Sequence, residues 1–199
     1  MKTSLRQRAD KIKVGRCKNL IAVLEEPKNV KNIGTVIRNI NALGVDKLYI
    51  INEKNIVPRE WESMRNNREL MTLSVSAVKW TFVKYFKTTA ECFDHLEKNG
   101  YVSIVTSPHI KGKENVILQH GDFTQGKLAV WFGNESRGIS DEAVERCAAC
   151  IQIEMYGIIE SFNLGTSTGI VLYEITKQRR AYQAKHKRAR RKNPPIKPK

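Results

Sequence analysis

The sequence predicts an α/β fold with a mainly parallel sheet and helices on both of its faces. Short apolar runs that suit strands alternate with segments of helical periodicity, and no internal repeat interrupts this order. Several of these runs are continuously apolar, which is typical of strands buried on both faces. The 199 residues are enough for one domain of about 150 residues with extensions.

The first unit reads as strand, helix, strand. Residues 20–24 (LIAVL) form a buried strand that Glu25-Glu26-Pro27 ends. In the helix that follows, Ile33, Val36, Ile37 and Ile40 recur at helical spacing; we expect Asn32 to cap its start and Gly44 to end it. Residues 47–52 (KLYIIN) form the next strand, which completes a βαβ unit.

The middle of the chain continues the alternation. Residues 53–72 are polar and rich in arginine, and we expect a loop with a short helix. Residues 80–86 predict a short strand, and residues 88–99 predict a helix that Gly100 ends. Two further strands are predicted at residues 101–106 (YVSIVT) and 127–132 (KLAVWF).

The last third adds two helices and one strand. Ser140 is a good N-cap for a short helix, whose first turn holds Asp141 and Glu142. Residues 151–155 alternate like a strand, and a polar turn then leads to a helix that reaches residue 177. We divide the chain into a basic N-terminal extension (1–19), a folded domain (20–180) and a basic C-terminal tail (181–199) that we expect to be disordered.

The formal net charge of +15 indicates a polyanionic partner, either nucleic acid or an anionic membrane. The charge is concentrated at both ends, with seven Lys and Arg in residues 1–19 and eleven in residues 177–199. A membrane surface is the weaker choice, because Tyr182 and Ile196 are the only large apolar residues of the tail. No apolar run suits a membrane span or a signal peptide, so we expect a cytoplasmic protein.

Several chemistries are disfavoured. Cys147 and Cys150 have metal or redox spacing, but no second pair or nearby histidine completes a site, so we interpret them as buried structural thiols and expect no metal. The glycine patterns of dinucleotide sites and phosphate loops are absent. Residues 133–140 (GNESRGIS) lack the Gly-x-Ser-x-Gly spacing of a serine hydrolase.

Ligands of open α/β sheets bind beyond the carboxyl ends of the strands. Four polar segments are predicted there: 29–38, 106–109, 133–140 and 156–163.

Three of these segments resemble the motifs of the SpoU (TrmH-like) branch of the SPOUT RNA methyltransferases. They are NVKNIGTVIRNINALGV, with Asn32 and Arg38; FGNESRGIS, with Glu135; and IEMYGIIESFN, with Ser161 and Asn163. Their order, spacing and positions after predicted strands agree, and the resemblance covers roughly residues 20–179.

The resemblance implies a C-terminal trefoil knot, a homodimer, S-adenosyl-L-methionine as cofactor and methylation of ribose 2′-hydroxyls in RNA. The implied reaction-site residues are Arg38, Asn32, Glu135, Ser161 and Asn163. The implied cofactor-binding residues are Thr106, Gly133, Asn134, Ile153, Met155 and Phe162. We expect RNA to bind the basic ends through Arg6, Arg8, Lys11, Arg179, Arg180, Lys185, Lys187, Arg188, Arg190 and Arg191.

Arg38 matches the family's catalytic arginine and would reach a partner's cofactor. Arginine keeps its proton, so we favour a role in gripping a phosphate and stabilising developing alkoxide over a role as general base. Structural alternatives are a solvated surface position for Arg38, plain capping for Asn32, Ser161 and Asn163, and an ion pair with Arg137 for Glu135.

Three departures from the family pattern bear on the cofactor loop. Glu154 stands where the family usually has proline, which loosens the backbone and adds a carboxylate. Gly165 and Gly169 open the last helix and weaken it by about 1 kcal/mol each relative to alanine. Phe162 replaces a more usual leucine and enlarges one wall of the site.

These observations favour an RNA ribose 2′-O-methyltransferase, with a non-catalytic RNA-binding or assembly protein on the same fold as the alternative. Short extensions, in place of a separate RNA-binding domain, favour tRNA over rRNA as substrate.

Overall fold

A computed structural model describes residues 15–55, 61–109, 114–124 and 126–192, together with Ser4, Gln7, Asp10 and Ile12. The strands are β1 (Cys17–Glu25), β2 (Val45–Ile51), β3 (Phe82–Phe86), β4 (Tyr101–Thr106), β5 (Asn115–Ile117), β6 (Lys127–Phe132) and β7 (Ala149–Gln152). The α-helices are α2 (Val30–Leu43), α3 (Trp61–Asn66), α4 (Arg68–Leu73), α5 (Thr89–Lys98), α6 (Asp141–Arg146) and α7 (Leu164–Lys192). Two 3₁₀ turns are η1 (Ala77–Trp80) and η2 (Leu118–His120).

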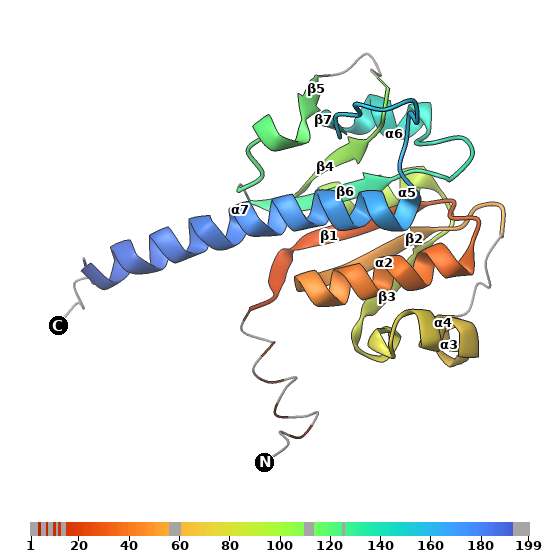
Figure 1. The fold of residues 1–199 in the computed structure, drawn as a ribbon, viewed down its shortest axis with the longest axis horizontal. Coiled ribbons are helices and arrows are strands. Elements are labelled where there is room, and N and C mark those ends of the chain that lie inside the picture. The colour runs from red at the N-terminus through yellow and green to blue at the C-terminus, as the bar shows by residue number, and fades with distance from the viewer. Residues whose placement is uncertain are drawn as a thin grey trace.

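The described strands form one sheet in the order β3-β2-β1-β6-β4-β7-β5 (Figure 1). Every pairing between them is parallel, so the predicted sheet type is confirmed. The chain first builds outward from β1 to β3 and then crosses to the other side of β1, where β4, β5, β6 and β7 lie and β6 pairs with β1. This change of direction opens a crevice at the carboxyl ends of the strands, which is the usual place for a ligand.

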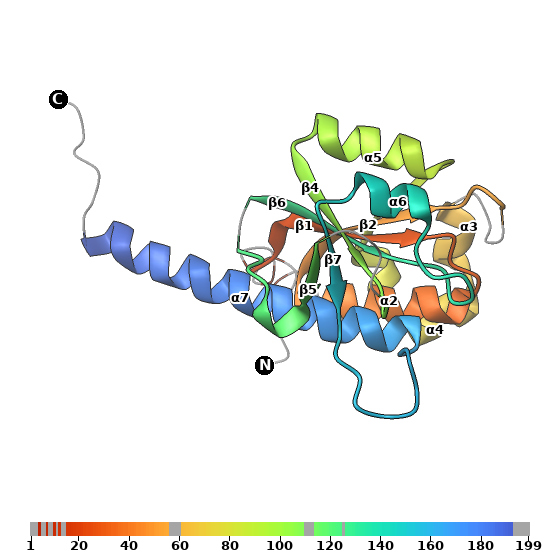
Figure 2. The same ribbon diagram turned by 90° about the horizontal axis from the view of Figure 1, so that it is seen from above.

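Helices cover both faces of the sheet, as predicted (Figure 2). On one face α2 and α7 pack side by side, with α4 beside α2, over a core that includes Ile33, Ile37 and Val171. On the other face lie α5 and α6, where the Phe93 and Trp131 rings stack with centroids 4.1 Å apart. Fully buried side chains of this size stabilise the fold by about 1.5–3 kcal/mol each.

The boundaries of several elements differ from those predicted, and two of the differences have a clear cause. Asn29, not Asn32, caps α2, because the Asn29 side chain accepts a hydrogen bond from the Lys31 amide. Gly44 ends α2 in the left-handed conformation, as expected. β7 ends at Gln152 and not at Met155, because its neighbours β4 and β5 provide no pairing residues beyond that point.

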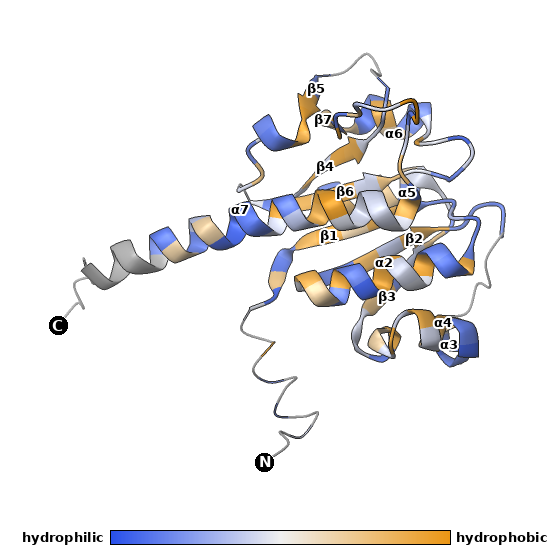
Figure 3. Ribbon diagram, in the orientation of Figure 1, coloured by the Kyte–Doolittle hydropathy of each residue, from blue (hydrophilic) through white to orange (hydrophobic). Residues whose placement is uncertain are grey.

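Helix α7 continues to Lys192, so the tail that we expected to be disordered from residue 181 is helical over its first twelve residues. Alanine, glutamine, lysine and arginine dominate this stretch and are strong helix formers, and the first proline comes only at Pro194. Figure 3 shows that α7 carries its apolar residues mainly where it covers the sheet and that the coloured turns beyond the sheet are mostly hydrophilic. Residues 193–199 lie outside the described part of the chain.

All four cysteines are buried, in agreement with the interpretation of Cys147 and Cys150 as structural thiols. Burial raises the pKa of the Cys92 and Cys17 thiols, which keeps them protonated. Among the helices of the described residues, none combines the length and the apolar character that a membrane span requires.

Candidate active site

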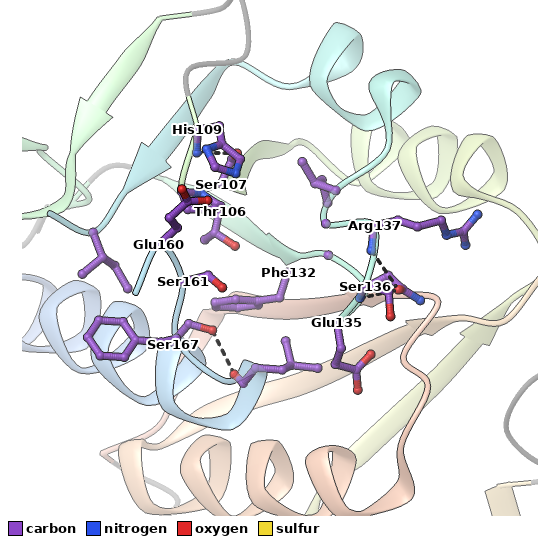
Figure 4. A pocket seen from close by; sticks show the side chains of 18 of the residues that line it. Thr106, Ser107, His109, Phe132, Glu135, Ser136, Arg137, Glu160, Ser161 and Ser167 are labelled. Atoms are coloured by element: carbon purple, nitrogen blue, oxygen red, sulfur yellow. Dashed lines mark hydrogen bonds between the residues drawn. The ribbon is translucent and has the colours of Figure 1, made fainter. Parts of the chain in front are cut away.

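A cavity of about 300 Å³ opens at the carboxyl ends of β4, β6 and β7. Its lining comes from residues 106–109, 132–139 and 151–167 (Figure 4). Three of the four polar segments singled out in the sequence therefore meet in one place. The volume is at the lower end of the roughly 300–1,000 Å³ that small-ligand sites span.

All six residues expected to bind a cofactor line this cavity: Thr106, Gly133, Asn134, Ile153, Met155 and Phe162. Apolar side chains and polar ones share the wall. The Thr106 hydroxyl donates to the Trp131 carbonyl at 2.9 Å, which fixes its direction at the end of β4. Ser161 also lines the cavity, on the segment that enters α7.

The turn after β6 is compact and depends on Gly133. A Cβ atom there would lie 2.2 Å from the Gly138 carbonyl carbon, so a larger residue would push the two strands of the turn apart. The backbones of Asn134 and Gly138 exchange hydrogen bonds of 2.9 and 2.8 Å. The Asn134 side chain accepts from the amides of Ser136 and Arg137 and donates to the Glu26 carbonyl. This side chain therefore folds the turn, and a ligand would meet Asn134 through its backbone.

A buried carboxylate that the sequence analysis did not single out anchors this turn to β1. Glu25 accepts from the Ser140 amide at 2.8 Å, from the Ser140 hydroxyl at 2.6 Å and from the Thr89 hydroxyl at 2.7 Å. Glu25 is almost fully buried. Its position at the end of an otherwise apolar strand was the signal available in the sequence. The same Ser140 hydroxyl caps α6, as predicted.

Three expected reaction-site residues form one hydrogen-bonded chain across the motifs. Asn32 Nδ2 donates to Glu135 Oε1 at 2.7 Å, and Asn163 Nδ2 donates to Asn32 Oδ1 at 3.1 Å. Asn163 Oδ1 in turn accepts from the Gly165 amide at 2.8 Å at the start of α7. The first turn of α2, the turn after β6 and the segment before α7 are thus held together by side chains of the predicted set.

Lys28 joins this chain and was missed in the sequence analysis. Its backbone amide donates to Glu135 Oε2 at 2.9 Å, and its ammonium donates to the Ser136 hydroxyl at 2.8 Å. Both carboxylate oxygens of Glu135 therefore accept hydrogen bonds, one from Asn32 within α2 and one from Lys28 just before it. An ion pair with Arg137, the structural alternative considered for Glu135, is not among the salt bridges of the described residues.

Arg38 stands apart from these residues. It is exposed on α2, and the residues that line the cavity do not include it. The structure therefore places four of the five expected reaction-site residues in or beside the cavity and leaves the fifth on the outer surface of the same protomer.

Of the residues expected to bind RNA, two contact the folded domain, five lie in the later turns of α7 and three lie outside the described residues. Arg179 is buried, and its guanidinium donates to the carbonyls of Phe123 at 3.0 Å and Gly126 at 2.8 Å, so it holds the segment before β6 and cannot face RNA. Arg180 donates to the Leu43 carbonyl at the end of α2. Lys185 is exposed on α7. Lys187, Arg188, Arg190 and Arg191 belong to the last turns of α7. Arg6, Arg8 and Lys11 lie outside the described residues.

A sequence model of the SpoU rRNA Methylase family matches residues 19–173, which span the sheet, the cavity and the first part of α7. The chain belongs to this family.

A tRNA (guanosine(18)-2′-O)-methyltransferase of Aquifex aeolicus is 29% identical over 164 residues, covering 82% of this chain and 72% of the relative. A crystal structure described as the A. aeolicus TrmH/SpoU tRNA modifying enzyme shares 27% identity and superimposes with a TM-score of 0.73, covering 90% and 86% of the two chains. The SpoU methyltransferase AviRb of Streptomyces viridochromogenes, solved in complex with AdoMet, has the same fold at 22% identity and a TM-score of 0.70, covering 86% and 64%.

The structure shows the contacts made by the residues that depart from the SpoU pattern. Glu154 faces away from the cavity toward a groove beside α7, where its carboxylate accepts from Gln119 and from the Tyr156 hydroxyl. That hydrogen bond raises the pKa of Tyr156. The carboxylate therefore ties the loop after β7 to η2, and the negative charge that we expected near the cofactor lies outside the cavity.

The two glycines of α7 let it approach α2 closely. A Cβ at Gly165 would lie 2.6 Å from the Thr35 side chain, and one at Gly169 would lie 3.3 Å from Asn39. Asn39 donates to the Gly165 carbonyl at 2.7 Å. The cost in helix propensity is thus offset by the packing of α7 on α2.

Proposed function

We propose that this protein transfers a methyl group from S-adenosyl-L-methionine to a ribose 2′-hydroxyl of RNA. The observation that carries the proposal is the meeting of the three SpoU motifs around one cavity at the switch point of the sheet. The names of its relatives, which describe ribose methylation of tRNA, support the same chemistry.

The residues present fit this cofactor. Gly133 lets the turn after β6 close against the backbone of Gly138, which fixes the main chain of that turn at the cavity wall. Ile153, Met155 and Phe162 offer apolar walls for an aromatic ring, and the turn around Gly133 with the Thr106 hydroxyl offers polar groups. When bound there, the cofactor would supply an electrophilic methyl group. Among the described residues no group of His, Cys, Asp and Glu is arranged to hold a metal ion.

The chain's own residues would position the acceptor. Asn32, Glu135 and Asn163 hold the three loops in register, so that Ser161 faces the cavity from a fixed backbone. Arg38 would grip the phosphate beside the target ribose with its planar fork and stabilise negative charge that develops on the 2′-oxygen. The proton of the hydroxyl would pass to that phosphate, because an arginine does not act as a base.

We propose a homodimer in which Arg38 of one protomer completes the site of the other. Arg38 is exposed and does not line its own cavity, which supports this arrangement. A largely apolar groove of about 630 Å³ between α2, η2 and α7, with exposed Tyr156 and Tyr173 at its edge, suits a second copy. The trefoil knot of the family and a cytoplasmic location belong to the same proposal.

Mixing two inactive variants tests the sharing of Arg38. Arg38→Ala and Ser161→Ala should each lack activity as purified homodimers. If Arg38 acts across the interface, a co-refolded mixture regains about a quarter of the wild-type rate, because half of the dimers are mixed and each has one complete site. An inactive mixture that contains verified heterodimers would show that Arg38 acts within its own protomer.

We favour tRNA over rRNA as substrate because a relative named for tRNA aligns over most of both chains. The alternative, an RNA-binding protein without activity, is disfavoured because all five motif residues are present and four of them lie in or beside the cavity. Incubation with methyl-labelled cofactor and total RNA, followed by alkaline hydrolysis, distinguishes them. Label in an alkali-resistant dinucleotide from the tRNA fraction is expected; cofactor binding without labelled RNA would refute the enzyme.

A further inference from the structure

Three lysines from three elements lie toward the amino-terminal end of the sheet, away from the cavity: Lys47 near the start of β2, Lys84 midway along β3 and Lys98 at the end of α5. Lys47 pairs in register with Phe82, and its ammonium lies 6.0 Å from the centre of the Phe82 ring. Lys84 follows two residues later on the same face of β3, and its ammonium lies 3.3 Å from His95 Nδ1. We call these three lysines with His95 the lysine rim.

The charges of the rim act on one another. The pKa of His95 is lowered first by burial and then by Lys84, Lys47 and Lys98, so all three ammonium groups lie within electrostatic range of one imidazole. A histidine surrounded in this way stays neutral at physiological pH and can accept a hydrogen bond from Lys84.

The nearby carboxylates do not neutralise the rim. Asp94 and Glu97 on α5 both pair with Arg146, at 2.7 and 2.9 Å. Asp46 on β2 pairs with Arg16 at 3.6 Å. In the part of the chain that the structure describes, no ion pair involves Lys47, Lys84 or Lys98. The rim therefore keeps an excess of positive charge that an anionic partner can neutralise.

Two large aromatic side chains lie exposed beside the rim. Phe82 is 56% exposed at the start of the edge strand β3, and Trp80 is 50% exposed just before it. Exposed rings next to lysines are the arrangement with which proteins bind single-stranded nucleic acid, since bases stack on the rings while ammonium groups meet the phosphates.

Both basic ends of the chain lead to this end of the sheet. Arg16, at the end of the N-terminal extension, donates to the Trp80 carbonyl at 3.2 Å. Arg180, at the point where α7 becomes basic, contacts Leu43 at the end of α2. Figure 1 shows α7 running past the start of β1. The rim thus continues the positive surface of the two ends onto the folded domain.

We propose that the lysine rim, with Phe82 and Trp80, is a second contact surface for the RNA substrate, where it holds an unpaired stretch of backbone remote from the reacting ribose. This inference rests on the proposed function for the identity of the polyanion. The rim supplies affinity and orientation and takes no part in the methyl transfer, because it lies at the opposite end of the strands from the cavity.

The test compares two double variants of equal charge. Lys47→Ala with Lys98→Ala removes two of the three rim lysines, and Lys54→Ala with Lys87→Ala removes two exposed lysines near the carboxyl ends of β2 and β3. RNA affinity is measured by filter binding between about 50 and 200 mM salt. The rim variant should bind about tenfold more weakly at 100 mM salt, and its salt slope should fall by about 1.4, as two lost contacts with single-stranded phosphates imply. The control should stay near wild type.

Phe82→Ala should weaken binding about fivefold without changing the salt slope, because stacking involves no counterion release. At saturating RNA both rim variants should keep the wild-type kcat and raise only KM. An unchanged slope in the lysine variant, or an equal loss in the control pair, would overturn the proposal. Methyl transfer by the wild-type protein is read separately, so a failure of the proposed function is not mistaken for a failure of the rim.

Discussion

The two ends of the sheet are built by different physical means. At the carboxyl end, short hydrogen bonds between loops distant in sequence define the cavity, and Glu25, Asn32 and Glu135 each connect two or more segments. At the amino-terminal end, lysines and aromatic rings lie on β2, β3, η1 and α5 and make few contacts with one another. The carboxyl end holds the site residues in fixed positions, whereas the amino-terminal end presents positive charge on the surface.

The difference follows from what each end has to bind. Group transfer loses rate when reacting atoms move by about 1 Å, so the loops of a reaction site need many mutual restraints. Phosphate contacts tolerate such movement because long-range attraction to a polyanion depends on charge and less on direction. We therefore expect substitutions at the carboxyl end of the sheet to change activity by displacing the site residues. Substitutions at the amino-terminal end should change RNA affinity by removing charge.

The largest effect is expected from Gly133→Ala. The new Cβ would lie 2.2 Å from Gly138, so the turn after β6 must shift and the cavity wall with it. We expect cofactor affinity measured by calorimetry to fall about 100-fold or more. Gly157→Ala is the matched control, because a Cβ there meets no atom within 4 Å. Equal binding by the two variants would show that the cavity wall is more plastic than its contacts indicate.

Two asparagines three residues apart provide the second test. Asn32→Ala breaks the chain between Glu135 and Asn163 and should lower kcat/KM about tenfold while leaving thermal stability nearly unchanged. Asn29→Ala removes the cap of α2 and should cost about 1 kcal/mol of stability with little loss of rate. A loss of stability without a loss of kcat/KM in Asn32→Ala would show that Asn32 has only a structural role.

The parts of this architecture that could be predicted from sequence are those with local signals. Strands such as residues 101–106 and 127–132 were predicted with the observed boundaries, because continuous apolar runs between turn residues leave little choice. The cavity-lining segments followed from their positions after these strands and from the motifs. Gly44 and Ser140 ended or capped their helices as predicted, since both act through neighbours a few residues away.

What could not be predicted depends on partners far along the chain. Glu25 meets Ser140, which is 115 residues away, and Lys28 meets Glu135, which is 107 residues away. Nothing local distinguishes these side chains from ordinary polar residues at the end of a strand. Arg179 misled for the same reason, because nothing in the basic run shows that its partners are the carbonyls of Phe123 and Gly126 in another segment. The missed strand β5 has only three residues.

The smallest effect on function is expected within the basic part of α7, where Arg179 and Lys185 should behave in opposite ways. Lys185→Ala removes one exposed charge and should weaken RNA binding about threefold, with the salt slope reduced by about 0.9 if the contacted phosphate lies in a duplex. Arg179→Ala leaves the Phe123 and Gly126 carbonyls without their donor and should lower the free energy of unfolding by about 2–3 kcal/mol. Its RNA affinity, measured well below the unfolding temperature, should stay close to wild type. If Arg179→Ala instead reduced the salt slope of RNA binding while the protein stayed fully stable, Arg179 would have to leave its buried site to bind RNA. The boundary between the part of α7 that packs on the sheet and the part that binds RNA would then lie closer to the sheet.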